Sequence, residues 1–196
     1  MVEQQEATPS AARNRTQRAI LAAAASVLAR DRSATLPQIA LAADVGRTTL
    51  HRYFPERDGL VNAAVDDSLE LIGEAIREAA PHEGGVWEAM RRLVAALASV
   101  SDRIMFVFGD PSLLRDLGPT PAGQQLPDDP VLGLIRRGQA DGVFDAEVSA
   151  GWLQQVLWAL LYTAFEQVER GTLARYDVVP TVLRTLERGI TATGSA

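Results

Sequence analysis

Hydrogen-bond donors are concentrated in one short segment of the chain, residues 47–52. The segment contains two arginines, two threonines and a histidine, namely Arg47, Thr48, Thr49, His51 and Arg52. A guanidinium group can pair bidentately with guanine, and hydroxyl and imidazole groups can donate to base edges or to phosphate oxygens. On one face of a helix, these side chains would suit the major groove of DNA. The same spacing fits equally well a helical hairpin whose exposed arginines are merely hydrated.

Two short helices joined by a tight turn are expected to position these donors. Thr35 and Gln38 have the spacing of a capping box, with Pro37 in the tolerated first turn. The residues from Asp44 to Gly46 interrupt this helix, and a second helix is expected from about residue 47 to residue 54, where Pro55 follows. The apolar residues that could pack this pair against an earlier helix over residues 16–30 are Ile39, Ala40, Val45, Leu50 and Phe54 from the pair, and Ile20, Ala24 and Leu28 from the earlier helix. This arrangement is a helix-turn-helix.

The charge of the chain is distributed unevenly. The net charge is -6, yet residues 13–57 carry eight arginines and three acidic residues, a balance of +5. From residue 58 onward the balance is -9. A cationic module joined to an acidic body suits a polyanion bound at one end, although an ordinary hydrated surface explains the charges equally well.

The remaining sequence predicts an all-α protein with about nine helices. Helical periodicity continues over residues 57–80, 86–99, 103–108, 131–140, 149–170 and 176–191, and residues 109–130 are rich in proline and predict a loop. We expect a flexible N-terminal arm at residues 1–12, a DNA-binding domain at 13–58 and a larger ligand-binding and dimerisation domain at 59–196.

Composition excludes several classes of function. The 196 residues include no cysteine and only two histidines, and no HExxH, GxSxG or P-loop pattern is present. We therefore expect neither an enzyme nor a cofactor or metal site. No apolar run predicts a membrane span or a signal peptide, so we expect a cytoplasmic protein.

Two features of the C-terminal half point to partners. The segment 149–170 is apolar around most of its circumference, so it needs a second surface, either within a monomer or from a copy paired through segments 149–170 and 176–191. Aromatic residues and methionines are also concentrated in this half. They could line a ligand pocket or form ordinary core, and the candidates are Trp87, Met90, Met105, Phe106, Trp152, Trp158, Tyr162 and Phe165.

The run TLPQIALAADVGRTTLHRYFPERDGLVNAAV, residues 35–65, resembles the N-terminal domain of TetR-family regulators. The resemblance implies base contacts from Arg47 and Thr48 and a base or phosphate contact from Thr49. It implies phosphate contacts from Thr35, Tyr53 and Arg57, with His51 and Arg52 on the same surface. His51 stands where tyrosine is frequent, Arg57 where lysine is usual, and Asp44 where the turn commonly has glycine.

The same resemblance implies a function. Such a chain would be a homodimeric repressor, released from a palindromic double-stranded operator by a small apolar or amphipathic molecule. The alternative is an all-α structural or adaptor protein that binds no DNA, which would leave the donor-rich segment 47–52 without a role.

Overall fold

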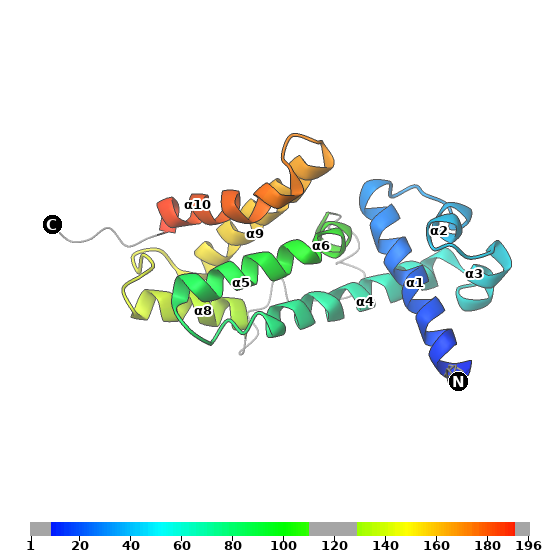
Figure 1. Ribbon diagram of the computed structural model, residues 1–196, viewed down its shortest axis with the longest axis horizontal. Coiled ribbons are helices and arrows are strands. Elements are labelled where there is room, and N and C mark those ends of the chain that lie inside the picture. Colours follow the sequence, from blue (N-terminus) through cyan, green and yellow to red (C-terminus); the bar gives the residue numbers. More distant parts are fainter. Residues whose placement is uncertain (1–8, 110–128, 191–196) are drawn as a thin grey trace, which may run out of the picture. The chain divides into compact units, whose positions relative to one another are not determined.

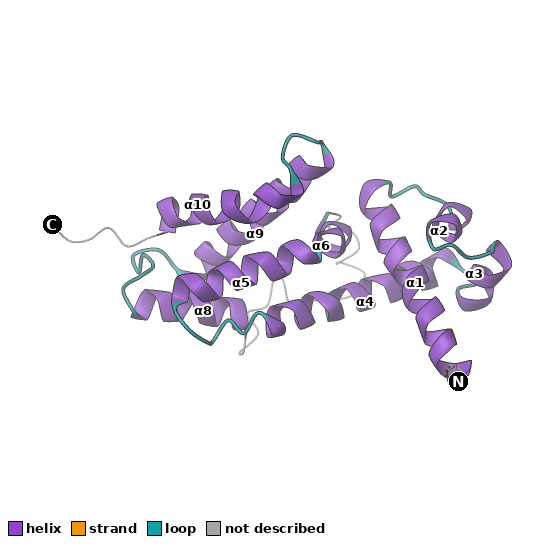
Figure 2. Cartoon of the chain, viewed as in Figure 1, coloured by secondary structure: helices purple, strands orange, loops and turns teal. Residues whose placement is uncertain are grey.

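The computed structural model describes residues 9–109 and 129–190, and these residues are entirely helical apart from turns and connections (Figures 1 and 2). They form nine α-helices and one 3-10 turn, as the all-α prediction requires. The α-helices are Pro9–Arg30 (α1), Leu36–Ala42 (α2), Arg47–Tyr53 (α3), Arg57–Glu78 (α4), Val86–Ser99 (α5), Ser101–Phe108 (α6), Pro130–Ala140 (α8), Ala150–Glu169 (α9) and Val178–Ile190 (α10). The 3-10 turn is Arg175–Asp177.

The chain divides into two compact units between Glu70 and Leu71, inside α4. The first ends twelve residues later than the domain boundary expected at residue 58, which falls inside the unbroken helix α4 from Arg57 to Glu78. α1 begins at Pro9, so the expected arm at residues 1–12 overlaps the first helical turn. Residues 1–8 of that arm, and most of the proline-rich loop predicted at 109–130, lie outside the described residues.

In the first unit, α1 packs on α2 and α2 packs on α3. The predicted core is confirmed, since all but one of its eight residues are at most 8% exposed and Val45 is partly buried. The α2–α3 turn is a Schellman motif, in which the Val45 amide donates to the Ala40 carbonyl and the Asp44 amide to Leu41. Asp44 has φ 53°, the left-handed conformation that aspartate tolerates.

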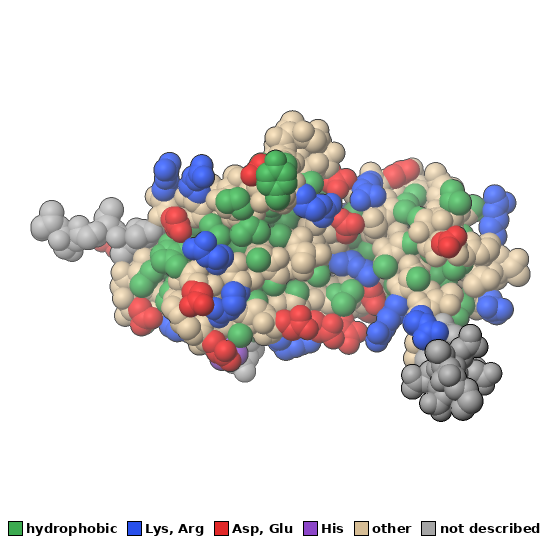
Figure 3. Space-filling model, viewed as in Figure 1, with side chains coloured by type: hydrophobic (Ala, Val, Ile, Leu, Met, Phe, Trp, Pro, Cys, Tyr) green, Lys and Arg blue, Asp and Glu red, His purple; other side chains and the backbone are tan. Residues whose placement is uncertain are grey.

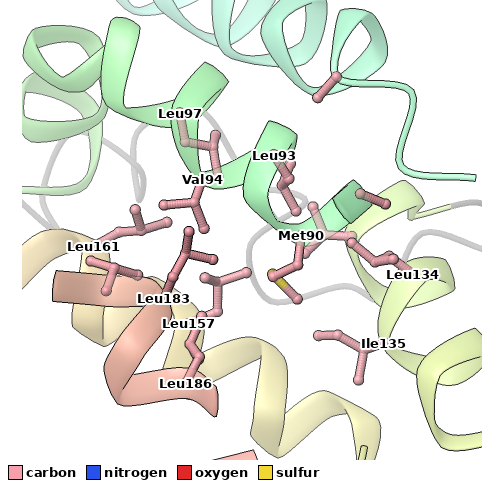
Figure 4. Packing of buried hydrophobic residues seen from close by; sticks show 14 of the residues in the cluster. Met90, Leu93, Val94, Leu97, Leu134, Ile135, Leu157, Leu161, Leu183 and Leu186 are labelled. Atoms are coloured by element: carbon pink, nitrogen blue, oxygen red, sulfur yellow. The ribbon is translucent and has the colours of Figure 1, made fainter. Parts of the chain in front are cut away.

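The second unit is built around one apolar core, drawn from α5, α8, α9 and α10 (Figure 4). α9 packs along both α8 and α10, and α10 packs on α5. The side chains that meet there include Met90, Leu93, Val94 and Leu97 of α5, Leu134 and Ile135 of α8, Leu157 and Leu161 of α9, and Leu183 and Leu186 of α10. All of these are at most 5% exposed.

Phe144 joins α8 to α5 at one end of this core. Its ring is completely buried and lies directly on Gly138, where an added Cβ would stand 2.3 Å from the ring Cδ2 atom. Its other side meets Trp87 edge-on, with ring centroids 5.0 Å apart. Only glycine therefore allows the ring to approach α8 so closely.

The end of α4 carries an alanine in an unfavourable conformation. Ala80 has φ 45°, a left-handed value that costs a non-glycine residue about 1–2 kcal/mol. We expect Ala80→Gly to raise the free energy of unfolding by up to about 1 kcal/mol in urea titrations, because relief of this strain exceeds the added chain entropy. Ala95→Gly, at an exposed site inside α5, is the control and should lower it by a similar amount. A loss of stability in both variants would contradict the expectation.

Within the described ranges, no helix has both the length and the apolar character needed to cross a membrane.

Candidate DNA-contacting surface and ligand pocket

The donors of segment 47–52 occupy the outer face of α3. Arg47, Thr48, His51 and Arg52 are exposed, whereas Leu50 on the opposite side of the helix is 2% exposed. Successive residues of a helix are rotated by about 100° around its axis, so the four exposed side chains fall within an arc of about 140° around α3. Thr49 is partly buried at the edge of this arc. The structure thus places the donors outward, and arginine side chains project from the outer edge of the unit (Figure 3).

Thr35 caps α2 in the position expected from the sequence. Its backbone amide donates to Gln38 Oε1 at 2.7 Å, and its hydroxyl donates to the same oxygen at 2.8 Å. Gln38 therefore supplies the reciprocal half of the predicted capping box. Thr35 remains exposed, and its hydroxyl lone pairs stay available to a further donor.

A cluster of two arginines around Tyr53 adds a residue that the sequence analysis did not single out. The guanidinium carbon of Arg13, on α1, lies 6.0 Å from the Tyr53 ring centroid, and that of Arg52 lies 5.8 Å from it. The Tyr53 hydroxyl donates to the Arg13 carbonyl at 3.3 Å, which ties α3 to the start of α1. Among the described residues no carboxylate is paired with either arginine. The sequence feature that could have pointed to Arg13 is the group of arginines at positions 13, 15 and 18, near the start of the first helix.

Arg57 has a different environment from the one expected. One terminal guanidinium nitrogen donates to the Ala34 carbonyl, and the other donates to the Arg32 carbonyl at 2.7 Å. The side chain is partly buried, and it fastens the start of α4 to the α1–α2 connection. In the same connection, hydrogen bonds from the Ser33 hydroxyl and amide hold the pKa of the exposed Asp31 carboxyl below its usual value. Arg57 therefore positions α4, and the phosphate contact expected of its remaining donors stays a prediction.

A pocket opens in the second unit, where the α5–α6 junction faces the end of α9 and the start of α10. The pocket is small, with a volume of about 20 Å³. Apolar side chains form part of the lining, among them Met105, Phe165 and Val178. The polar lining consists of Ser101, Asp102, Glu169 and Arg175. The lining is mixed in polarity, but a volume of about 20 Å³ holds little more than one water molecule, whereas ligand pockets usually measure about 300–1,000 Å³.

The eight aromatic residues and methionines expected near a ligand do not form one group. Met105 and Phe165 line the pocket, while the other six are absent from its walls. Met90 and Phe106 are completely buried, Trp87 packs on Phe144, and Trp158 stacks on Phe108 at 6.3 Å between centroids. Tyr162 is partly buried, and Trp152 is 63% exposed on α9.

Comparison with known proteins supplies the decisive observation. Residues 20–64 match the family model of bacterial regulatory proteins of the tetR family. Over 182 residues the chain is 37% identical to the HTH-type transcriptional repressor LfrR of Mycolicibacterium smegmatis, covering 92% of this chain and 93% of that protein. The chain belongs to the TetR family. It is a DNA-binding regulator of transcription and not an enzyme, in agreement with the resemblance in residues 35–65.

Solved structures of TetR-like proteins agree with this assignment. The crystal structure of LfrR superposes with a TM-score of 0.71 at 33% identity, over 92% of this chain and 99% of that chain. The structure of LfrR in complex with proflavine gives a TM-score of 0.68, also at 33% identity, over 91% and 99% of the two chains.

A second sequence relative is the HTH-type transcriptional regulator NfxB of Pseudomonas aeruginosa, which is 28% identical over 160 residues, 81% of this chain and 84% of that protein.

Proposed function

We propose that this TetR-family regulator is a cytoplasmic repressor that binds a palindromic operator as a homodimer and is released by an amphipathic molecule. The observation that carries the DNA-binding part is the outward donor face of α3, formed by Arg47, Thr48, His51 and Arg52 opposite the buried Leu50. Repression is proposed from the similarity to LfrR, which is a transcriptional repressor. Thr35, Thr49 and Tyr53 complete the proposed surface through contacts to phosphate or bases.

The proposed dimer uses α9 and α10. The apolar stripe of α10, which includes Val182, Leu183 and Leu186, is already buried within the chain. α9 in contrast keeps Trp152 exposed and Val156 and Leu160 only partly covered, although Leu157 and Leu161 on its other side are buried. A second copy of the chain would cover this remaining apolar face of α9.

The proposed effector combines an apolar body with a polar or charged group. Support comes from the lining of the pocket, where α6 contributes Asp102 and Met105 and α9 contributes Phe165 and Glu169; an effector would have to widen the pocket to enter it. Proflavine, which is bound in a structure of LfrR, is a flat amphipathic molecule of this kind and a suitable first probe.

Selection of duplexes from a random pool by the purified chain tests the proposal. The expected winner is a palindrome whose half-sites lie one helical turn apart, because each protomer of a dimer would place one α3 in the major groove. Light scattering should give twice the mass of 21.1 kDa. Proflavine should weaken binding of the selected duplex in fluorescence anisotropy. Failure to retain any duplex at low ionic strength would overturn the proposal.

Arg13 is expected to contact phosphate together with Tyr53 and Arg52. Two guanidinium groups lie 6.0 and 5.8 Å from the centroid of one ring, and a phosphate bound near that ring would be attracted by both charges. Arg13→Ala should therefore weaken binding of selected and random duplexes by the same factor. It should also reduce the slope of the logarithm of the binding constant against the logarithm of salt concentration by about one. The exposed Arg15, two residues along α1, points to another side of the helix, and Arg15→Ala is the control. A loss of affinity for the selected duplex alone would contradict a phosphate contact.

A further inference from the structure

The side-chain amide of Gln38, in α2, is held in one orientation by Thr35. Gln38 Oε1 accepts two hydrogen bonds from Thr35, one from the backbone N–H at 2.7 Å and one from the hydroxyl at 2.8 Å. Because a backbone N–H can only donate, the amide atom that faces it must be the oxygen and not the nitrogen. Gln38 is exposed, and its Nε2 group has no acceptor among the residues that the structure describes. Two N–H donors are thus left free on this side chain.

Thr35 has no proton left for a ligand in this arrangement. A hydroxyl group carries a single hydrogen, and Thr35 donates it to Gln38. The backbone beside it adds little, because Pro37 has no N–H and the Gln38 backbone amide donates to the Thr35 carbonyl at 3.0 Å. Phosphate oxygens accept hydrogen bonds, so they need a donor from the protein. In residues 35–38 the side-chain donor that remains is Gln38 Nε2.

Glutamine and glutamate are not equivalent at position 38. A capping box accepts either residue, since it needs only a side-chain oxygen that receives the backbone N–H of the cap. Glutamate would, however, place a charged oxygen where Gln38 has Nε2, and that oxygen would repel a phosphate group. The first turns of α2 and α3 contain no acidic side chain. Both short helices therefore begin without a charge that opposes an anion.

We propose that Gln38 Nε2, oriented by Thr35, donates a hydrogen bond to a phosphate oxygen of the bound DNA. In a helix-turn-helix the second helix lies in the major groove, while the first helix of the motif crosses the phosphate backbone. α2 is this first helix, because α3 carries the outward donor face. The contact rests on the proposed function. It refines the contribution of Thr35, which acts on the DNA as a positioning residue through Gln38.

Gln38→Glu tests the contact, because it removes the Nε2 donor and keeps the acceptor for Thr35. Asn62→Asp is the matched control, since it makes the same change from amide to carboxylate at an exposed site of α4 in the same unit. In fluorescence anisotropy, Gln38→Glu should weaken binding of selected and random duplexes alike, by about tenfold or more, as for a lost hydrogen bond to a charged group. Asn62→Asp should weaken both by about threefold or less, through general repulsion. The urea midpoint of Gln38→Glu should match that of the parent, because the capping box is kept.

Variants of Thr35 separate the two residues. Thr35→Val removes the hydroxyl but keeps the backbone N–H that holds Gln38, so it should weaken binding less than Gln38→Glu does. Thr35→Ser restores the hydroxyl and should bind as the parent does. If Thr35 acts through Gln38, Thr35→Val should cause no further loss in the Gln38→Glu background. A full additional loss in the double variant would show that Thr35 contacts the phosphate itself, and it would overturn the proposal.

A neutral variant keeps the test independent of the added charge and of folding. Gln38→Met removes the donor without adding a charge, and it should also weaken both duplexes. It should leave the salt dependence unchanged, because a neutral donor displaces no counterions.

The outcomes distinguish this contact from the function on which it rests. Equal affinities of Gln38→Glu and Asn62→Asp would overturn the contact and leave DNA binding by α3 intact. A loss for the selected duplex alone would indicate a base contact and would also overturn it. Failure of the parent to bind any duplex would overturn the proposed operator complex, and with it the contact from Gln38.

Discussion

Replacing Phe144 with alanine is expected to lower the free energy of unfolding by about 3–5 kcal/mol. The ring is completely buried between Gly138 and Trp87, so its removal loses the transfer free energy and leaves a cavity against a helix that cannot collapse freely. This is a large share of the roughly 5–15 kcal/mol that stabilises a typical protein. Urea unfolding followed by circular dichroism, at one fixed protein concentration, measures the loss.

Two further variants show whether the loss comes from this packing. Tyr176→Ala removes an aromatic ring that is 81% exposed and should change stability by less than about 0.5 kcal/mol. Gly138→Ala inserts a methyl group 2.3 Å from a ring atom and should itself cost about 1–3 kcal/mol. In the double variant Phe144→Ala/Gly138→Ala, the methyl group can occupy space that the ring vacates. The double variant should therefore lose less stability than the two single variants lose together. A loss below about 1 kcal/mol for Phe144→Ala would contradict the described packing.

Local patterns predicted the elements of the first unit well. Capping, turn and proline signals act over a few residues, which is why Thr35, Asp44 and Pro55 marked the two short helices correctly. The apolar spacing also identified the buried side of α3, and with it the exposed side. The direction of the donors thus followed from the sequence, because a helix with Leu50 inward must turn residues 47, 48, 51 and 52 outward.

Contacts between residues far apart in the sequence escaped prediction. The phosphate contact expected of Arg57 stays a prediction, but its hydrogen bonds to carbonyls 23 and 25 residues away in the α1–α2 connection were not foreseen. Arg137 binds carbonyls 55 and 56 residues before it. No local pattern distinguishes these arginines from exposed neighbours such as Arg136, since the difference is the position of a backbone segment from elsewhere in the chain.

The pocket shows the same limit for apolar residues. Periodicity identifies the side of a helix that is buried, but it does not separate a side chain that fills the core from one that lines a cavity. Met90 and Met105 were therefore equal candidates in the sequence, yet Met90 is completely buried in the core and only Met105 lines the pocket. The ligand contacts of all eight candidates stay a prediction.

Arg47→Ala is expected to weaken binding of the selected operator by about 1–3 kcal/mol, or about 5- to 150-fold. Arg47 is the first residue of α3, directly after the capping Gly46, and it is exposed. A bidentate contact to guanine is lost completely with the guanidinium group, whereas binding to random duplex depends on phosphate contacts and loses only the general attraction of one charge. The ratio of the two affinities should therefore fall.

Fluorescence anisotropy at two salt concentrations separates these contributions. Arg18→Ala, which removes an exposed arginine from α1 in the same unit, is the control and should change both affinities by the same small factor. Repeating the selection with Arg47→Ala should relax the base preference at one position in each half-site, because only the contact made by that side chain is missing. If Arg47→Ala binds the operator as tightly as the parent and selects the same palindrome, then base recognition must come from Thr48, His51 or Arg52, and the role assigned to Arg47 is wrong.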